Sequence, residues 1–226
     1  MRTDEFGSQF PHFIAANVLS YIGVPIILKN GEVFGSLCAV DSKPTIFTEE
    51  EKQFFTKIAR LFSYVVELER LAIFDSLTGL YNRHFLYENV QLQNPGSILF
   101  LDLDGFKTIN DDFGHDIGDF VLKEVANRLK ALTKNYPDSY AVRLGGDEFV
   151  IVVPQLIDKD DIADFANQVI RMMDNWQIFD KKLQLTTSIG IVRYPSDGKD
   201  IKLLLKFADL ALYRAKAKGK NNYQFY

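Results

Sequence analysis

Cysteine is nearly absent from this chain. Cys38 is the only cysteine among 226 residues, so the chain cannot form an internal disulfide. The N-terminus also lacks the cationic and apolar pattern of a secretory leader. Both absences predict a protein of the reducing cytoplasm.

Long apolar runs and an excess of positive charge are missing as well. The longest mainly apolar stretch, residues 18–28, contains Gly23 and Pro25 and is too short to cross a bilayer. The 26 Lys and Arg residues are outnumbered by 30 Asp and Glu residues, which leaves a net charge of −4. Because clustered Lys and Arg hold phosphate backbones, we expect no nucleic-acid partner and no membrane segment in this chain. Hydrophobic residues make up 47% of the sequence, which is enough for a sizeable core.

The periodicity changes near Asp75 and predicts two parts, residues 1–74 and 75–226. In the first part, residues 22–28 and 33–40 are predicted strands, joined by a tight Asn-Gly turn at residues 29–32. A long helix follows, because Thr48 and Glu51 have the spacing of a capping box. Its apolar stripe either packs on the preceding sheet or pairs with a second copy of the chain. The stripe consists of Phe55, Ile58, Phe62, Val65, Leu68 and Ala72.

The second part is predicted to be an α+β domain with a central antiparallel sheet, in the split β-α-β-β-α-β order. In this topology the first two strands run the same way, so Asp102 should lie at the same sheet edge as Asp147 and Glu148. We expect these three carboxylates to converge. The predicted strands are residues 97–103, 139–143, 149–153 and 183–192, and the predicted helices are residues 120–132, 162–173 and 201–217.

The three carboxylates provide hard oxygen ligands, which suit Mg²⁺ better than a metal that prefers nitrogen or sulfur. Mg²⁺ usually completes its shell with water and substrate phosphates, so this pattern predicts a nucleoside triphosphate substrate. Gly145 and Gly146 precede the two acidic residues and allow a close approach of backbone to ligand. The simpler interpretation of any one of these acids is a solvent-facing side chain at a strand end.

Four blocks stand out in the first part: residues 20–26, 31–35, 37–41 and 47–50, which read SYIGVPI, GEVFG, LCAVD and FTEE. With these blocks, residues 14–73 resemble the C-terminal half of a GAF domain. A whole GAF domain has more elements upstream, so this one is truncated or reduced and lacks most of a ligand pocket. Small units bury little surface, and we therefore expect this segment to be stabilised by dimer contacts or to be partly mobile.

The second part contains a series of distinctive blocks, among them LGGDEF at residues 144–149 and FGHDIGD at residues 113–119. With these blocks, residues 75–226 resemble a GGDEF-family diguanylate cyclase, whose ferredoxin-like or palm fold agrees with the predicted strand order. The resemblance implies an enzyme that needs Mg²⁺, or alternatively Mn²⁺, and joins two GTP molecules into cyclic di-GMP with release of two pyrophosphates. Each domain holds one GTP, so catalysis implies a homodimer. The matching blocks are residues 75–83, 102–111, 113–119 and 144–149, followed by residues 208–213 and 216–221.

The resemblance also implies roles for individual residues. Asp147 accepts the proton of the ribose 3′-hydroxyl, and Lys107 stabilises the pentacoordinate phosphorus. The implied metal ligands are Asp102, the Leu103 carbonyl, Asp147 and Glu148. The implied substrate-binding residues are Asn110 and Asp119 for guanine, His115 near the substrate, Lys216 and Lys220 for the phosphates, and Gly145 and Gly146 in the turn.

Two positions depart from the family pattern. The family often has Arg where this chain has Lys220, and Lys lacks the forked geometry of a guanidinium. Many members also carry an Arg-x-x-Asp site for inhibition by product, where this chain has Tyr136-Pro137-Asp138-Ser139. We therefore expect no product inhibition through that site. Two alternatives to a diguanylate cyclase are a catalytically idle GTP-binding or interaction module and a cyclase that makes a mononucleotide ring.

Overall fold

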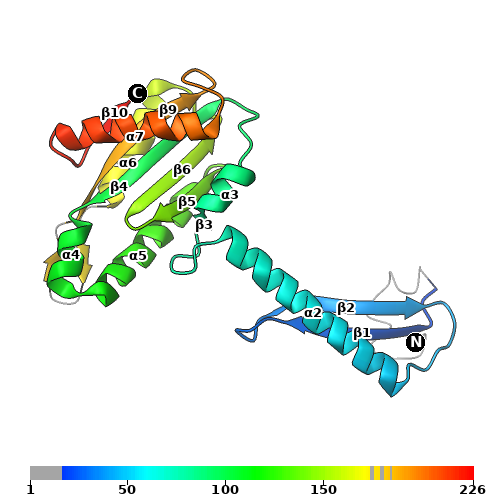
Figure 1. Ribbon diagram of the computed structural model, residues 1–226. Coiled ribbons are helices and arrows are strands. Elements are labelled where there is room, and N and C mark those ends of the chain that lie inside the picture. The colour runs from blue at the N-terminus through cyan, green and yellow to red at the C-terminus, as the bar shows by residue number, and fades with distance from the viewer. Residues whose placement is uncertain (1–16, 174–175, 179–180, 184) are drawn as a thin grey trace. The chain divides into compact units, whose positions relative to one another are not determined.

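The computed structural model describes residues 17–173, 176–178, 181–183 and 185–226. The chain divides into two compact units, Met1–Leu71 and Ala72–Tyr226 (Figure 1). Residues 14–16 of the GAF-like segment lie outside the described residues, as does the rest of the N-terminus before them. None of the helices in the described ranges has the length and apolarity needed to cross a bilayer.

The first unit begins with a two-stranded antiparallel hairpin, as predicted. Strand β1, Ser20–Ile27, pairs with β2, Val33–Asp41. The turn between them is closed by the Leu28 amide, which donates to the Glu32 carbonyl at 2.9 Å. Gly31 lies in this turn with a φ of +84°, a backbone conformation that glycine adopts without steric cost.

Helix α2, Glu49–Ile73, begins at the predicted capping box. The Thr48 amide donates to Glu51 Oε2 at 2.7 Å, and the Glu51 amide donates to Thr48 Oγ1 at 3.2 Å. These reciprocal bonds satisfy two amides that have no partner inside the helix. The capping box therefore fixes where the helix begins.

The two sides of α2 differ in burial. Ala59 and Ser63 are buried, and the Arg70 guanidinium on the same unit pairs with Glu32 at 3.1 Å. In contrast, Leu61 and Leu68 are 61% and 66% exposed. Phe62 and Val65 of the predicted stripe are also about half exposed, whereas Phe55 and Ile58 are partly buried. The interpretation that the whole stripe packs on its own sheet is therefore wrong for its C-terminal half.

The second unit is built on a six-stranded sheet whose order is β10-β9-β4-β6-β5-β3. The four central strands are antiparallel, and each edge strand is parallel to its neighbour. This arrangement confirms the predicted α+β fold with the split β-α-β-β-α-β order. The strands are β3 Tyr81–Asn82, β4 Gly96–Asp104, β5 Tyr140–Gly145, β6 Glu148–Pro154, β9 Thr186–Tyr194 and β10 Tyr223–Phe225.

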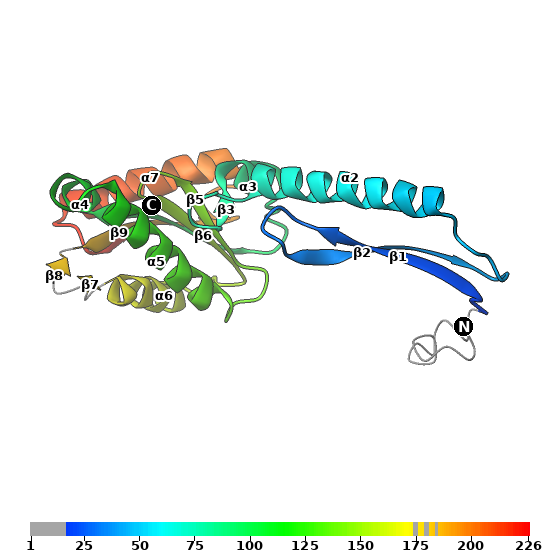
Figure 2. The ribbon, with the colours of Figure 1, turned by 90° about the horizontal axis from the view of Figure 1, so that it is seen from below.

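Helices cover both faces of this sheet. Figure 2 shows α7, Ile201–Ala217, on one face, and α5, His115–Thr133, with α6, Lys159–Met172, on the other. Side chains of β4 alternate between the two resulting cores. Leu99 and Leu101 pack with α5 and α6, whereas Ile98 and Phe100 pack with α7. Two shorter helices complete the unit, α3 Arg83–Glu88 and α4 Phe106–Phe113.

Several boundaries differ from the predicted ones. The fourth long strand begins at Thr186 and not at Leu183, because Leu183 pairs with Trp176 in a separate hairpin. That hairpin consists of β7, Trp176–Ile178, and β8, Lys181–Leu183. Helix α5 begins at His115, five residues before its first predicted residue. The short elements were not predicted because two to eight residues contain too little periodicity to identify them.

Candidate active site

The acidic residues gather at one edge of the sheet. Asp102, near the end of β4, lies opposite Glu148, the first residue of β6. The Leu103 amide donates to the Asp147 carbonyl at 3.3 Å, which ties the turn before β6 to β4. Strand direction therefore brings together residues that are more than forty positions apart in the sequence, as predicted.

The charges at this edge act on one another. Burial raises the pKa of Asp147 above its ordinary value, and the negative charge of Asp102 raises it further. Burial also raises the pKa of Glu148, with further contributions from Asp102 and Asp147. Like charges in a partly buried place disfavour ionisation. The edge therefore attracts a cation.

A lysine from α7 provides positive charge at this edge. Lys216 Nζ lies 2.7 Å from Asp102 Oδ1, and its charge lowers the pKa of Asp147, against the larger effects of burial and Asp102. Helix α7 contacts both β4 and β9, so a side chain near its C-terminal end reaches the end of β4. The structure thus brings Lys216, predicted to bind phosphate, to the acidic edge.

The three carboxylates do not form a ready-made metal site. Among the described residues, no group of three or more His, Cys, Asp or Glu side chains lies close enough to hold one ion. The three carboxylates act on one another without forming a three-ligand cluster, and Asp102 is paired with Lys216. The donors still fit Mg²⁺, which needs only one or two carboxylates beside substrate phosphates and water. Asp102, whose negative charge raises the pKa of Asp147, and Asp147 itself would be such a pair.

The turn before Asp147 is held by an arginine that sequence reasoning missed. Arg143 donates to the Gly146 carbonyl from Nε at 3.0 Å and from Nη2 at 2.8 Å. Its Nη1 donates to Asp75 Oδ1, also at 3.0 Å. Burial raises the pKa of Asp75, but hydrogen bonds from Thr78 and Arg143 outweigh it and hold the pKa below its ordinary value. The sequence offered one indication of this role, because Arg143 lies only three residues before Gly146 of the glycine pair.

Asp104 was also missed by sequence reasoning. Its carboxylate is 7% exposed and accepts hydrogen bonds from Thr186 Oγ1 at 3.0 Å and Ser188 Oγ at 2.9 Å. It also accepts from the Asn221 amide at 3.2 Å, in the turn that follows α7. This buried carboxylate therefore fastens the Lys220 region to β4. The sequence offered one indication of this contact, because Thr186 and Ser188 stand at alternate positions of a predicted strand and so place their hydroxyls on the same face.

Asn110, His115 and Asp119 lie on either side of a corner between two helices. Gly114, with a φ of +84°, separates α4 from α5. Asn110 is partly buried in the last turn of α4, and His115 and Asp119 are exposed in the first turns of α5. Lys107 on α4 and Lys220 after α7 are exposed, and neither forms an ion pair within the part of the chain described here.

Gly145 and Gly146 are both exposed in the turn between β5 and β6 and have φ values of +145° and +53°. Within the described ranges, no atom from another part of the chain lies within 4 Å of where a Cβ would stand on either residue. The backbone conformation, and not crowding within the protein, therefore requires glycine here. The space beside the turn is open to a ligand.

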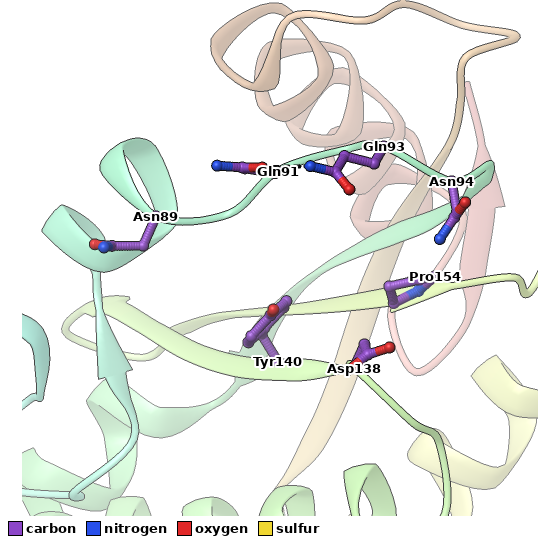
Figure 3. Close-up of a pocket in the computed structure, with 7 residues that line it drawn as sticks. All are labelled: Asn89, Gln91, Gln93, Asn94, Asp138, Tyr140 and Pro154. Carbon is purple, nitrogen blue, oxygen red and sulfur yellow. Dashed lines mark hydrogen bonds between the residues drawn. The ribbon is translucent and has the colours of Figure 1, made fainter.

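A separate polar pocket lies at the far end of the sheet (Figure 3). Pro154 is the last residue of β6, so this pocket is at the opposite end of that strand from Glu148. It contains none of the predicted site residues. Four carboxamides, one carboxylate, one phenol and one proline line it: Asn89, Gln91, Gln93, Asn94, Asp138, Tyr140 and Pro154.

Two family sequence models match the chain. The family described as "Diguanylate cyclase, GGDEF domain" matches residues 72–222, and the GAF domain matches residues 4–66. The first match covers well over half of the chain. The second supports the GAF resemblance of the N-terminal segment.

Among curated relatives, the bifunctional diguanylate cyclase/cyclic di-GMP phosphodiesterase MucR of Pseudomonas aeruginosa is 39% identical over 169 residues. The match covers 71% of this chain and 24% of MucR, so the chain spans about a quarter of that relative. Diguanylate cyclase DgcP of Escherichia coli is 32% identical over 242 residues, with 95% of this chain and 70% of DgcP covered.

Solved structures show the same fold. The coiled coil and GGDEF domain of DgcB from Caulobacter crescentus, crystallised with c-di-GMP, superposes with a TM-score of 0.67 at 25% identity. The superposition covers 77% of this chain and 96% of that one. The sheet, the acidic edge and these matches together lead to one conclusion: the chain belongs to the GGDEF family of diguanylate cyclases, with a GAF segment before the GGDEF domain.

Proposed function

We propose that the chain condenses two GTP molecules into cyclic di-GMP with release of two pyrophosphates. The observation that carries this proposal is the acidic edge, where Asp102 faces Glu148 and lies beside Asp147 and Lys216. Such an edge attracts a cation bound to a triphosphate. MucR and DgcP, which are named as diguanylate cyclases, support the same reaction for this chain.

Asp102, the Leu103 carbonyl and Asp147 would hold the metal ion, with Glu148 as a further ligand. Members of this family are generally metal-dependent, and the all-oxygen donor set favours Mg²⁺, with Mn²⁺ as an alternative. When bound, the ion offsets the negative charge that gathers on the phosphates. The proposed cation would therefore lie among Asp102, Asp147 and Glu148, whose negative charges repel one another.

Asp147 is the proposed general base. A base in a partly buried acidic site has a raised pKa, and the pKa of Asp147 is raised by burial and by Asp102. A carboxylate with a raised pKa takes up the proton of a ribose 3′-hydroxyl more readily than an ordinary one. Lys107 would stabilise the pentacoordinate phosphorus by its charge.

The other predicted residues would bind the rest of the nucleotide. Lys216 and Lys220 would contact the phosphates, and the open turn at Gly145 and Gly146 would allow the backbone to approach them. Asn110 and Asp119 would recognise guanine, because an amide donates to a ring carbonyl and a carboxylate accepts from ring and amino N–H groups. His115 would lie near the bound substrate.

We further propose that catalysis occurs in a homodimer, because each domain would supply half of a site for two substrates. The exposed face of α2 supports a helix pair, since Phe54, Leu61 and Leu68 are each at least 60% exposed and recur every seven residues. The solved DgcB structure, which contains a coiled coil and a GGDEF domain, offers a parallel. Residues 1–74 would then form the regulatory segment and residues 75–226 the catalytic domain, in the cytoplasm.

Product inhibition through the usual Arg-x-x-Asp positions is proposed to be absent. Tyr136 packs edge-to-face on Phe165 at a centroid distance of 4.9 Å, and Ser139 Oγ donates to the Tyr136 carbonyl at 2.8 Å. These side chains are used in packing and in closing a turn. The neighbouring pocket that includes Asp138 has no cation among its seven lining residues to attract phosphate.

A catalytically idle GTP-binding module is the second candidate. The absence of a three-ligand cluster among the described residues and the Asp102–Lys216 ion pair favour it. A site whose carboxylate is already neutralised by Lys216 could hold a nucleotide without turning it over. The products distinguish the candidates. A diguanylate cyclase forms cyclic di-GMP, a mononucleotide cyclase forms a cyclic mononucleotide, and an idle module leaves GTP unchanged.

The test is to incubate the purified full chain with GTP and MgCl₂ and to identify products by mass spectrometry. We expect cyclic di-GMP and pyrophosphate from the wild type. Asp147→Ala should lower turnover by at least a hundredfold, the usual contribution of a general base. Asp164→Ala, which removes an exposed carboxylate from α6, is the control and should be fully active. Unchanged GTP would support the idle module, and undiminished turnover by Asp147→Ala would exclude Asp147 as the base.

A further inference from the structure

Gly118 lies in the first turns of α5, directly before Asp119, and is buried. Asn110 from α4 occupies the space where a side chain at this position would stand. A Cβ on Gly118 would overlap Asn110 Oδ1 and would stand 3.0 Å from Asn110 Cγ. It would also stand 3.3 Å from Phe106 Cζ. The Asn110 carboxamide thus packs directly against the backbone of α5 at Gly118.

The backbone itself does not require glycine at this position. Gly118 has an ordinary helical conformation, unlike Gly114, whose φ is +84°. Glycine inside a helix costs about 0.5–1 kcal/mol relative to alanine. The reason for glycine must therefore be the space that Asn110 occupies.

We propose that Gly118 is a positioning residue for guanine recognition, because its missing side chain leaves room for the Asn110 carboxamide against the turn of α5 that carries Asp119. This inference rests on the proposed GTP function and deepens it. Two polar groups read a base well only when both are held at hydrogen-bonding distance, and a misplaced amide leaves one base atom unpaired. The space at Gly118 would fix the position of the Asn110 carboxamide relative to α5, the helix that carries Asp119.

The first variant to test is Gly118→Ala. The overlapped atom is the end of a flexible side chain, so Asn110 can rotate away and the fold should persist. The higher helix propensity of alanine also favours folding. We expect the wild type to bind the α,β-methylene analogue of GTP more tightly than that of ATP. In the variant the ratio of these two affinities should fall about tenfold, which corresponds to the loss of one hydrogen bond. Isothermal titration calorimetry on the full chain with MgCl₂ measures both affinities.

A double-variant cycle separates positioning from general damage. Asn110→Ala should lose the same preference, and adding Gly118→Ala to it should change nothing further, because no carboxamide is left to displace. Additive losses would overturn the proposal, as would an unchanged preference in Gly118→Ala. Asp116→Ala, an exposed change in the same helix turn, is the control and should keep the wild-type preference. If Gly118→Ala unfolds, recovery of folding in the double variant supports the contact, and continued unfolding contradicts it.

The outcomes also separate this inference from the proposed function. If the wild type binds neither analogue, the proposed GTP function fails together with any role in recognising guanine. If the wild type prefers the GTP analogue and Gly118→Ala does so equally, only the positioning role fails.

Discussion

At the scale of single residues, the site combines carboxylates with opposite effects on stability. Asp147 and Glu148 have raised pKa values because of burial and neighbouring negative charge. Asp75 has a lowered pKa because hydrogen bonds from Thr78 and Arg143 outweigh its burial. The first two residues therefore cost stability when they ionise, whereas Asp75 contributes stability when it ionises.

The predicted consequence is a pH-dependent gain in stability for Asp147→Asn in the metal-free protein. The folded-state pKa of Asp147 lies above its ordinary value of 3.8, so the cost of its charge is full above that raised pKa. The cost disappears as pH falls toward 3.8. At pH 7.5 in EDTA we expect the melting temperature to rise by no more than about 2–4 °C, because water screens this half-open site.

Asp75→Asn provides a control of opposite sign. Its folded-state pKa lies below 3.8, so its stabilising effect is present above 3.8 and is lost as pH falls through the lowered pKa. This variant should melt below the wild type at pH 7.5 and approach it in acid. A lower melting temperature for Asp147→Asn at pH 7.5 would contradict the burial argument. Thermal melts monitored by circular dichroism between pH 2 and 8 cover both trends, because the contribution of Asp75 is lost only below 3.8.

At the scale of elements, the sequence was informative wherever a pattern repeats over several turns or strands. The Asn-Gly turn, the Thr48–Glu51 cap and the order of the four central strands were all predicted. The contacts of Asp104 and Arg143 were not, because they join residues 82 and 68 positions apart through side chains. Likewise, the pairing of Lys216 with Asp102 depends on where α7 crosses β4, which no local pattern encodes. The roles proposed for the site residues stay predictions.

The rotational phase of helix α2 is expected to control catalysis. Each inserted residue rotates a helix by about 100°, so inserting two residues after Arg70 would turn the GGDEF domain about 200° relative to the exposed face of α2. We expect at least a tenfold loss of cyclic di-GMP formation. Inserting seven residues restores the phase to within about 20° and is the matched control, which should keep most activity. Equal activity across the series would argue against rigid coupling through this helix.

At the scale of the whole molecule, regulation is proposed to come from the first unit and not from bound product. Added cyclic di-GMP should leave the rate of the wild-type chain unchanged at concentrations well above those it forms. The double variant Tyr136→Arg with Ser139→Asp, which restores the family pattern, should bind product and become inhibited. Initial rates of pyrophosphate release measure this. Strong inhibition of the wild type that is lost on changing Tyr136 or Ser139 would contradict the proposal.

The ion pair between Lys216 and Asp102 has a consequence for the order in which ligands bind. Because the ammonium already neutralises Asp102, a divalent cation held as proposed would have to compete with Lys216 for this carboxylate. A triphosphate that attracts Lys216 toward its own oxygens would release Asp102 as it arrives. Nucleotide and cation would then assist each other's entry, and the resting protein would have little tendency to collect free metal from its surroundings.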